Sequence, residues 1–91
     1  MKIKVRSIAR FRAILGKETQ VELAEVARIE DLLEALCAAH SSLHSLLFGE
    51  AGLKEDVNIL VRGKNIESLQ GVRTELAEGD EVSLFPAAIG G

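Results

Sequence analysis

The hydrophobic residues change their spacing twice along this chain, and this limits the folds that it can adopt. Residues 2–12 alternate between polar and apolar positions, as in a half-buried strand, with a predicted inward face of Ile3, Val5, Ala9 and Phe11. The end of this run is also compatible with a turn before Gly16. Residues 19–23 alternate again. Because only a short segment separates the two runs, we expect an antiparallel hairpin, with Val21 and Leu23 facing inward.

A helical spacing begins at residue 29. Its apolar stripe, at i, i+3, i+4, i+7 and i+8, consists of Ile29, Leu32, Leu33, Leu36 and Cys37. Glu30 and Asp31 lie in the predicted first turn, where negative charge is favourable. Serines follow at positions 41, 42 and 45. Because serine is an indifferent helix former, we expect a break or a second short helix before Gly49 and Gly52.

The strand pattern returns in the second half of the chain. Residues 57–61 alternate in a third predicted strand, which is followed by a turn at Gly63 and a brief return over 65–66. Further turns are predicted at 69–71 and 78–80. A last strand over 81–85 is expected to end at Pro86, because proline cannot donate a ladder hydrogen bond. The order of hairpin, helix, strand, short strand and final strand predicts an α+β fold in one domain.

The charge and the cysteine content disfavour several classes of function. The 91 residues carry a formal net charge of −3, which argues against binding to nucleic acid or to an anionic membrane surface. No apolar run approaches the roughly 18 residues that cross a bilayer, and no secretory signal pattern precedes the first strand. Cys37 is the only cysteine, which indicates a reducing compartment. We therefore expect a cytoplasmic protein with neither a membrane nor a nucleic-acid partner.

Cys37, His40 and His44 form the candidate metal group of the sequence. Their spacing places them near one face of a helix, in a pattern compatible with zinc. Cys37, however, belongs to the aliphatic stripe, and no fourth ligand is evident, so we expect no metal site. A base that would activate Cys37 and a glycine-rich phosphate loop are also missing. The sequence therefore predicts no catalytic site and no bound cofactor in this chain.

Three stretches of the sequence resemble the ubiquitin-like β-grasp sulfur carriers. They are the opening IKVRSIARFRAILG, the helix IEDLLEALCAAH and the ending LAEGDEVSLFPAAIGG, in which a Gly-Asp turn, a strand, a proline and Gly-Gly occur together. The resemblance is greatest to the small-subunit family of molybdopterin synthase, and it extends to archaeal small ubiquitin-like modifiers and the thiamine-pathway sulfur carrier. Two positions depart from the family pattern. Arg62 stands where Asn usually precedes Gly63, and Ala87 stands where a second proline is common.

The resemblance implies an architecture and a division of the chain. The architecture is the ubiquitin-like β-grasp, in which a mixed four- to five-stranded sheet packs on one main helix. Residues 1–86 are then expected to form the β-grasp domain, and residues 87–91 a flexible C-terminal reactive tail.

The resemblance also implies a reaction at Gly91. In this reaction a ubiquitin-activating-type enzyme is expected to use ATP to adenylate the carboxylate of Gly91. Sulfur transfer then converts the adenylated carboxyl group to a thiocarboxylate. The large subunit of molybdopterin synthase receives the end of the chain, and the sulfur is used for molybdopterin. The residues implied in this insertion are Pro86, Ala87, Ala88, Ile89 and Gly90. Two alternatives stay open: a protein modifier that is joined through Gly91 to target-protein lysines, and a β-grasp interaction module whose Gly-Gly is incidental.

Three apolar residues occupy strand faces that are otherwise polar. They are Ile8, Leu60 and Phe85. The first, third and last strands of a β-grasp sheet are neighbours, so these side chains are predicted to converge in one patch that docks a partner. Burial at a sheet edge or a shift of strand register is an equally supported alternative.

Overall fold

The computed structural model describes residues 1–87 of the chain and places five strands in one sheet. These strands are β1 (Lys2–Ser7), β2 (Glu18–Glu22), β5 (Val57–Val61), β6 (Lys64–Asn65) and β7 (Glu81–Pro86). Their order is β2-β1-β7-β5-β6, so the last strand of the chain lies at the centre. β1 and β7 are parallel, whereas the other neighbours are antiparallel, including the predicted hairpin of β1 and β2.

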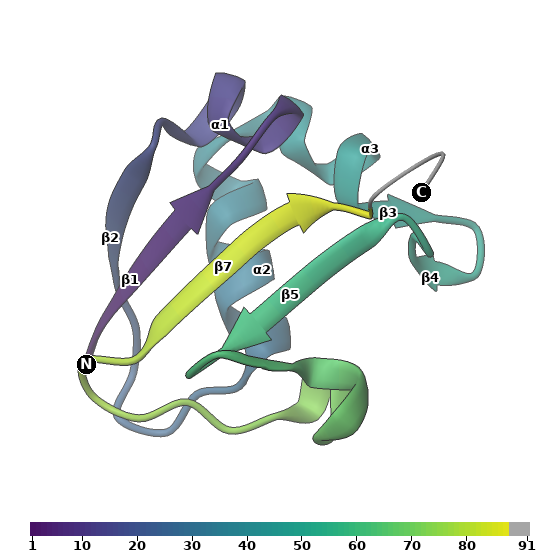
Figure 1. The fold of residues 1–91 in the computed structure, drawn as a ribbon. Helices are drawn as coiled ribbons and strands as arrows, with labels where there is room; N and C mark the ends of the chain where they lie inside the picture. Colours follow the sequence, from purple (N-terminus) through teal and green to yellow (C-terminus); the bar gives the residue numbers. More distant parts are fainter. Residues whose placement is uncertain (88–91) are drawn as a thin grey trace.

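One long helix, α2 (Ile29–Ala39), lies across one face of this sheet (Figure 1). No helix of residues 1–87 lies across the other face, which we call the open face. Smaller elements connect the strands: α1 (Arg10–Leu15), η1 (Ser41–Leu43), α3 (His44–Leu47), β3 (Phe48–Gly49), β4 (Gly52–Leu53), η2 (Ile66–Ser68) and η3 (Gly71–Arg73). A mixed five-stranded sheet on one main helix confirms the predicted α+β β-grasp architecture. Within residues 1–87, no helix has the length and the apolar character that crossing a membrane requires.

The core lies between α2 and the inward faces of the strands, and it is almost entirely aliphatic. The predicted stripe of α2 is buried at its first four positions, while Cys37 is only half-buried. The strands contribute a second set of buried residues: Ile3, Val5, Val57, Ile59, Val61, Val82 and Leu84. The connecting segments add further buried residues to this core: Phe11, Leu15, Leu43, Leu47, Ile66 and Leu76. Because each fully buried aliphatic side chain contributes about 1.5–3 kcal/mol, this core is the main source of stability.

The boundaries of α2 follow from its sequence. At the start, the carboxylate of Asp31 accepts a hydrogen bond from the backbone N–H of Arg28 at 2.8 Å, which satisfies one of the free donors of the first turn. At the other end, α2 stops at Ala39 and the chain continues as η1 and α3. The break that the serines predict is therefore confirmed.

The prediction of a strand over residues 2–12 is wrong beyond Ser7. The chain reverses at Ala9, which is exposed and has φ 57°, and residues 10–15 form α1. Phe11 and Leu15 are buried, one helical turn apart. The misprediction has a physical cause, because the spacing of Ala9 and Phe11 fits a strand face, while Phe11 and Leu15 fit one face of a helix. Arg10 and Arg12 therefore belong to α1 and not to the polar face of β1.

The prediction that the last strand ends at Pro86 is confirmed, although β7 is one residue longer than the predicted 81–85, because it includes Pro86 and pairs it with Val57. The backbone carbonyl of Leu84 accepts a hydrogen bond from the N–H of Ile8. The backbone groups of successive residues point to opposite edges of a strand, so those of Pro86 point toward β1, as those of Leu84 do. β1 has already ended there, and the missing N–H of proline costs no ladder bond.

Candidate functional site

The predicted reactive tail begins at the end of β7. Gly91, Gly90, Ile89 and Ala88 lie outside the residues that the structure describes, so their predicted roles, and the division of the chain at residue 86, stay predictions. Pro86 and Ala87 are described, and both are half-buried. The structure therefore shows how the root of the tail is held.

The backbone of Ala87 is tied to the segment that precedes β5. Its N–H donates a hydrogen bond to the carbonyl of Asp56 at 2.8 Å. The carboxylate of Asp56 lies 2.7 Å from Nη2 of Arg10, at the start of α1. The guanidinium of Arg10 in turn lies 4.8 Å from the centre of the Phe11 ring. Both charged side chains are partly exposed, so the pair contributes roughly 0–1 kcal/mol. It joins α1 to the residue whose backbone carbonyl holds Ala87.

Asp56 and Arg10 were not among the predicted site residues. They are 46 positions apart in the sequence, and they meet only because α1 folds back from β1. An isolated arginine and an isolated aspartate carry no signal of such a pair.

The three predicted docking residues lie on the open face of the sheet. β7 runs between β1 and β5, and Phe85 is paired with Asn58 while Leu60 is paired with Ser83. Ile8 follows directly after the pair of Ser7 with Leu84. Because alternate residues of these strands are buried against α2, Ile8, Leu60 and Phe85 share the opposite face.

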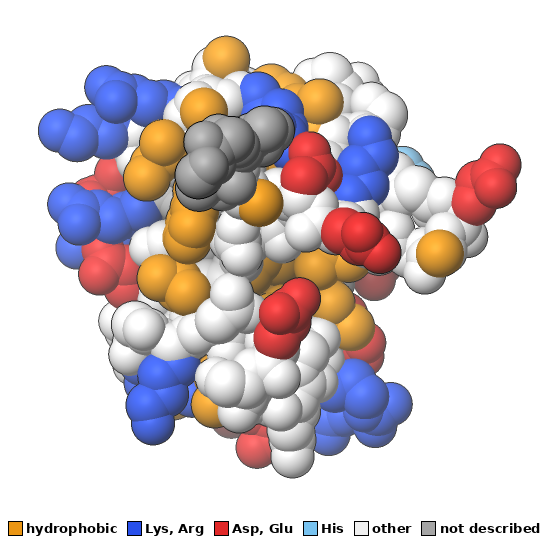
Figure 2. Space-filling model, turned by 45° about the vertical axis from the view of Figure 1, so that its right-hand side comes forward, with side chains coloured by type: hydrophobic (Ala, Val, Ile, Leu, Met, Phe, Trp, Pro, Cys, Tyr) orange, Lys and Arg blue, Asp and Glu red, His pale blue; other side chains and the backbone are white. Residues whose placement is uncertain are grey.

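The three residues differ in exposure. Ile8 is 57% exposed, whereas Leu60 and Phe85 are half-buried. Figure 2 shows hydrophobic side chains in a band down the left half of the view, with Lys and Arg side chains along its outer border. The structure thus brings the three residues to one face, next to the root of the tail. Their docking role stays a prediction.

A shallow hollow of about 310 Å³ adjoins Ile8 on this face. It is lined by Arg6, Ser7, Ile8, Arg12, Lys17 and Ser83. Arg12 and Lys17 reach it because α1 and the segment before β2 pack against the end of β1. Sequence patterns did not indicate these two residues, since their position depends on the unpredicted helix α1.

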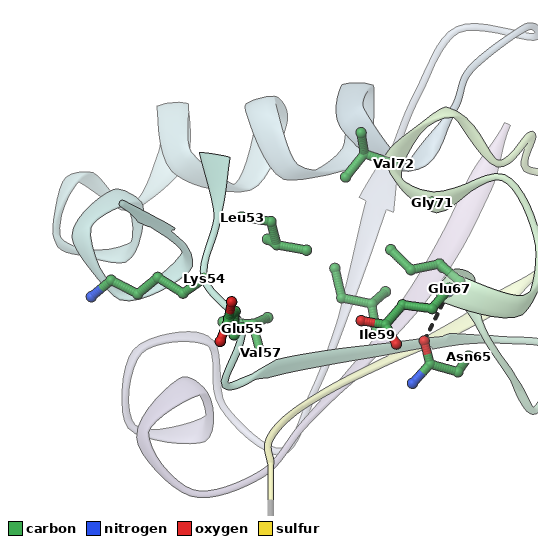
Figure 3. A pocket seen from close by; sticks show the side chains of 10 residues that line it. Leu53, Lys54, Glu55, Val57, Ile59, Asn65, Glu67, Gly71 and Val72 are labelled. Atoms are coloured by element: carbon green, nitrogen blue, oxygen red, sulfur yellow. Dashed lines mark hydrogen bonds between the residues drawn. The ribbon is translucent and has the colours of Figure 1, made fainter. Parts of the chain in front are cut away.

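A second hollow, of about 240 Å³, opens on the other side of β5 (Figure 3). Leu53, Ile59 and Val72 contribute apolar side chains to it, and Lys54 extends away from it. The N–H of Glu67 bonds to Oδ1 of Asn65 at its rim, at 2.9 Å. The charged residues of the lining are Lys54, Glu55 and Glu67.

The candidate metal group is not assembled in the structure. Across residues 1–87, no three or more side chains of His, Cys, Asp and Glu are grouped as a metal would require. The ring of His44 instead packs near that of Phe48, with centroids 5.0 Å apart. Burial raises the pKa of the Cys37 thiol above its ordinary value, which disfavours the thiolate that a nucleophile or a metal ligand needs.

Comparisons with known proteins identify the relatives of this chain. The sequence profile of the ThiS family matches residues 5–91. Small archaeal modifier protein 3 of Haloferax volcanii is 34% identical over the full length of both chains. The molybdopterin synthase sulfur carrier subunit of Chlamydomonas reinhardtii is also 34% identical, again over all of both chains. Among solved structures, SAMP1 from Haloferax volcanii has a TM-score of 0.85 and 30% identity, and the match covers all of both chains.

Proposed function

The chain belongs to the ThiS family, and we propose that it is a sulfur carrier whose Gly91 carboxylate is adenylated and converted to a thiocarboxylate for molybdopterin biosynthesis. The match to the ThiS profile, which extends to residue 91, carries the proposal. The full-length similarity to a molybdopterin synthase sulfur carrier subunit supports the pathway. ATP would be bound by the activating enzyme and not by this chain, and we place the reaction in the cytoplasm.

The chemistry begins with a carboxylate that is ionised at neutral pH, since its ordinary pKa is about 3.5. One carboxylate oxygen of Gly91 attacks the α-phosphorus of ATP, and pyrophosphate leaves. A persulfide sulfur then attacks the carbonyl of the acyl-adenylate and expels AMP. A thiol cleaves the resulting acyl disulfide, so that the thiocarboxylate is released and the thiol becomes part of a disulfide.

The proposal assigns the reacting carboxylate to this chain and the catalytic groups to its partners, the activating enzyme and the large subunit of molybdopterin synthase. The chain continues for six residues after Phe85, which span at most about 20 Å when extended. Such a tail can enter a narrow channel in a partner while Ile8, Leu60 and Phe85 dock on the surface around the entrance. Glycine at its end permits close approach of the partner's backbone.

A second candidate function is that of a protein modifier. It is supported by the full-length similarity to a relative that bears the name of a small archaeal modifier protein. In this alternative the same acyl-adenylate transfers Gly91, directly or through an enzyme thioester, to the amine of a target-protein lysine. The product is an isopeptide bond. Activation is common to both functions, and only the final acceptor differs.

Adenylation is tested with the ubiquitin-activating-type enzyme of the source organism, by ATP–pyrophosphate exchange. We expect exchange with the wild-type chain and none with a variant that lacks Gly90 and Gly91, because the acceptor carboxylate is displaced from the channel. The unfolding temperature of both proteins serves as the control for folding. Equal exchange with both proteins, or none with the wild type, would contradict the proposal and leave an interaction module with an incidental Gly-Gly.

A further inference from the structure

The open sheet face has an exposed apolar side chain, Ile8, beside a hollow that is lined by two cations without an ion pair in residues 1–87, Arg12 and Lys17. We propose that its docking partner is an acidic protein surface, in which carboxylates that pair with Arg12 and Lys17 flank an apolar site for Ile8. The inference rests on the proposed function, because it takes the adenylating enzyme to be the protein that docks there.

The geometry of the hollow beside Ile8 is held by backbone contacts. The N–H of Ser7 donates to the carbonyl of Lys17 at 3.1 Å, which fixes the segment before β2 against the end of β1. The N–H of Gly16 donates to the carbonyl of Arg12 at 2.8 Å and closes the end of α1. Arg12 and Lys17 thus come from two anchored segments on the same side of Ile8, and both line the hollow.

The charges around the hollow are unequal. Nε of Arg6 lies 3.5 Å from a carboxylate oxygen of Glu18 and 3.2 Å from one of Glu81, so this cation is neutralised within the chain. Arg12 and Lys17 form no ion pair within residues 1–87. No carboxylate is among the residues that line the hollow. The chain as a whole has a net charge of −3, so the excess of positive charge at the hollow does not result from an excess of basic residues in the protein.

The apolar component identifies the partner as a protein and not a small anion. Ile8 is one of two large hydrophobic residues that are exposed in the described chain, and the other, Val26, lies in the loop before α2. The buried Ser7 side chain shares the inward face of β1 with Ile3 and Val5, so it adds no hydroxyl to the outer face. Ser83 can offer one hydroxyl to the hollow, and Arg6 is already paired with Glu18 and Glu81. An apolar centre with charges at its rim is instead typical of a protein interface.

Charge reversal tests the proposal in the adenylation assay. The variants are Arg12→Glu and Lys17→Glu, and the matched control is Arg73→Glu. Arg73 is an exposed residue of η3, the green segment at the bottom of the view in Figure 1, whereas α1 lies at the top. We expect each of the first two variants to raise the KM for this chain about tenfold at low salt while kcat is unchanged, because rim charges act on association. The control should stay within about twofold of the wild type, and added salt should reduce the differences.

Three outcomes would overturn the proposal: an unchanged KM in both hollow variants, an equal rise in the Arg73→Glu control, or a rise that salt does not reduce. A small-anion site would overturn it as well, and it would appear as shifts of the Ile8 and Ser83 amide resonances on titration with millimolar inorganic phosphate. Unfolding temperatures check that all three variants fold. Failure of the proposed function is distinguishable, because the wild-type chain would then show no exchange at all.

Discussion

Arg62 occupies a backbone conformation that disfavours a side chain of its kind. It has φ 52° and is followed by Gly63 with φ 80°, so both central residues of the turn between β5 and β6 are left-handed. Such a turn favours Asn-Gly. The guanidinium of Arg62 bonds to the carboxylate of Asp80, which is 8% exposed and also accepts the N–H of Ala77 at 2.8 Å. The departure from Asn at position 62 is therefore offset by an ion pair that joins this turn to the start of β7.

The substitution Arg62→Asn separates these two effects. Asparagine tolerates the left-handed conformation, but the nearly buried carboxylate of Asp80 loses its cation. We expect the free energy of unfolding to fall by about 1 kcal/mol, as measured by urea denaturation. In an Asp80→Asn background the same substitution should be neutral or stabilising, because no buried charge is left without a partner. An equal loss in both backgrounds would contradict the role given to the ion pair.

Helix α1 shows, at the scale of an element, how one residue redirects the chain. With only six residues it is too short to be stable alone, and it is held by the burial of Phe11 and Leu15. Ala9, just before it, has φ 57° and ψ −130°, a combination that favours glycine. The reversal at Ala9 places the root of the tail beside Arg10 and brings Arg12 to the hollow at Ile8.

Replacing Ala9 with glycine should therefore stabilise the protein. Relief of a strained residue is worth about 1–3 kcal/mol, whereas the added flexibility of the unfolded chain costs roughly 0.5–1 kcal/mol. We expect Ala9→Gly to raise the free energy of unfolding by about 1 kcal/mol. The matched control is Ala13→Gly, at an exposed position within α1, which should lower it by about 1 kcal/mol. A loss of stability in Ala9→Gly would show that the reversal is not strained.

The elements that could be predicted are those with one dominant spacing. Strict alternation of apolar and polar residues identified the cores of β5 and β7, and the five-position stripe identified α2. In each case the apolar residues that are buried on one face fit the spacing of only one type of element. The segment after Ser7 could not be predicted, because its apolar residues satisfy both periods and the outcome depends on packing against distant residues. The same limit applies to the site. Strand parity placed Ile8, Leu60 and Phe85 on one face, whereas the contacts of Asp56, Arg12 and Lys17 depend on where α1 packs.

At the scale of the whole molecule, the sheet presents its open face, its cationic hollow and the root of its C-terminal segment near the same end. Asp56 holds the backbone of Ala87, and Ile8 lies one register position beyond the pair of Ser7 with Leu84 in β7. A partner that docks on the face is thereby close to the point from which the tail departs. In the proposed function, the domain presents the carboxylate of Gly91, and the proteins that bind the domain carry out the chemistry.

The intact mass of the protein isolated from its native cells tests this account most directly. We predict that a fraction of the protein has a mass increased by the exchange of one oxygen for one sulfur. Fragmentation should locate this exchange at Gly91. The mass of this fraction should return to the unmodified value after treatment with a thiocarboxylate-specific reagent and hydrolysis. A native protein that carries no sulfur at Gly91 and occurs only as isopeptide adducts on lysines would contradict the role of sulfur carrier.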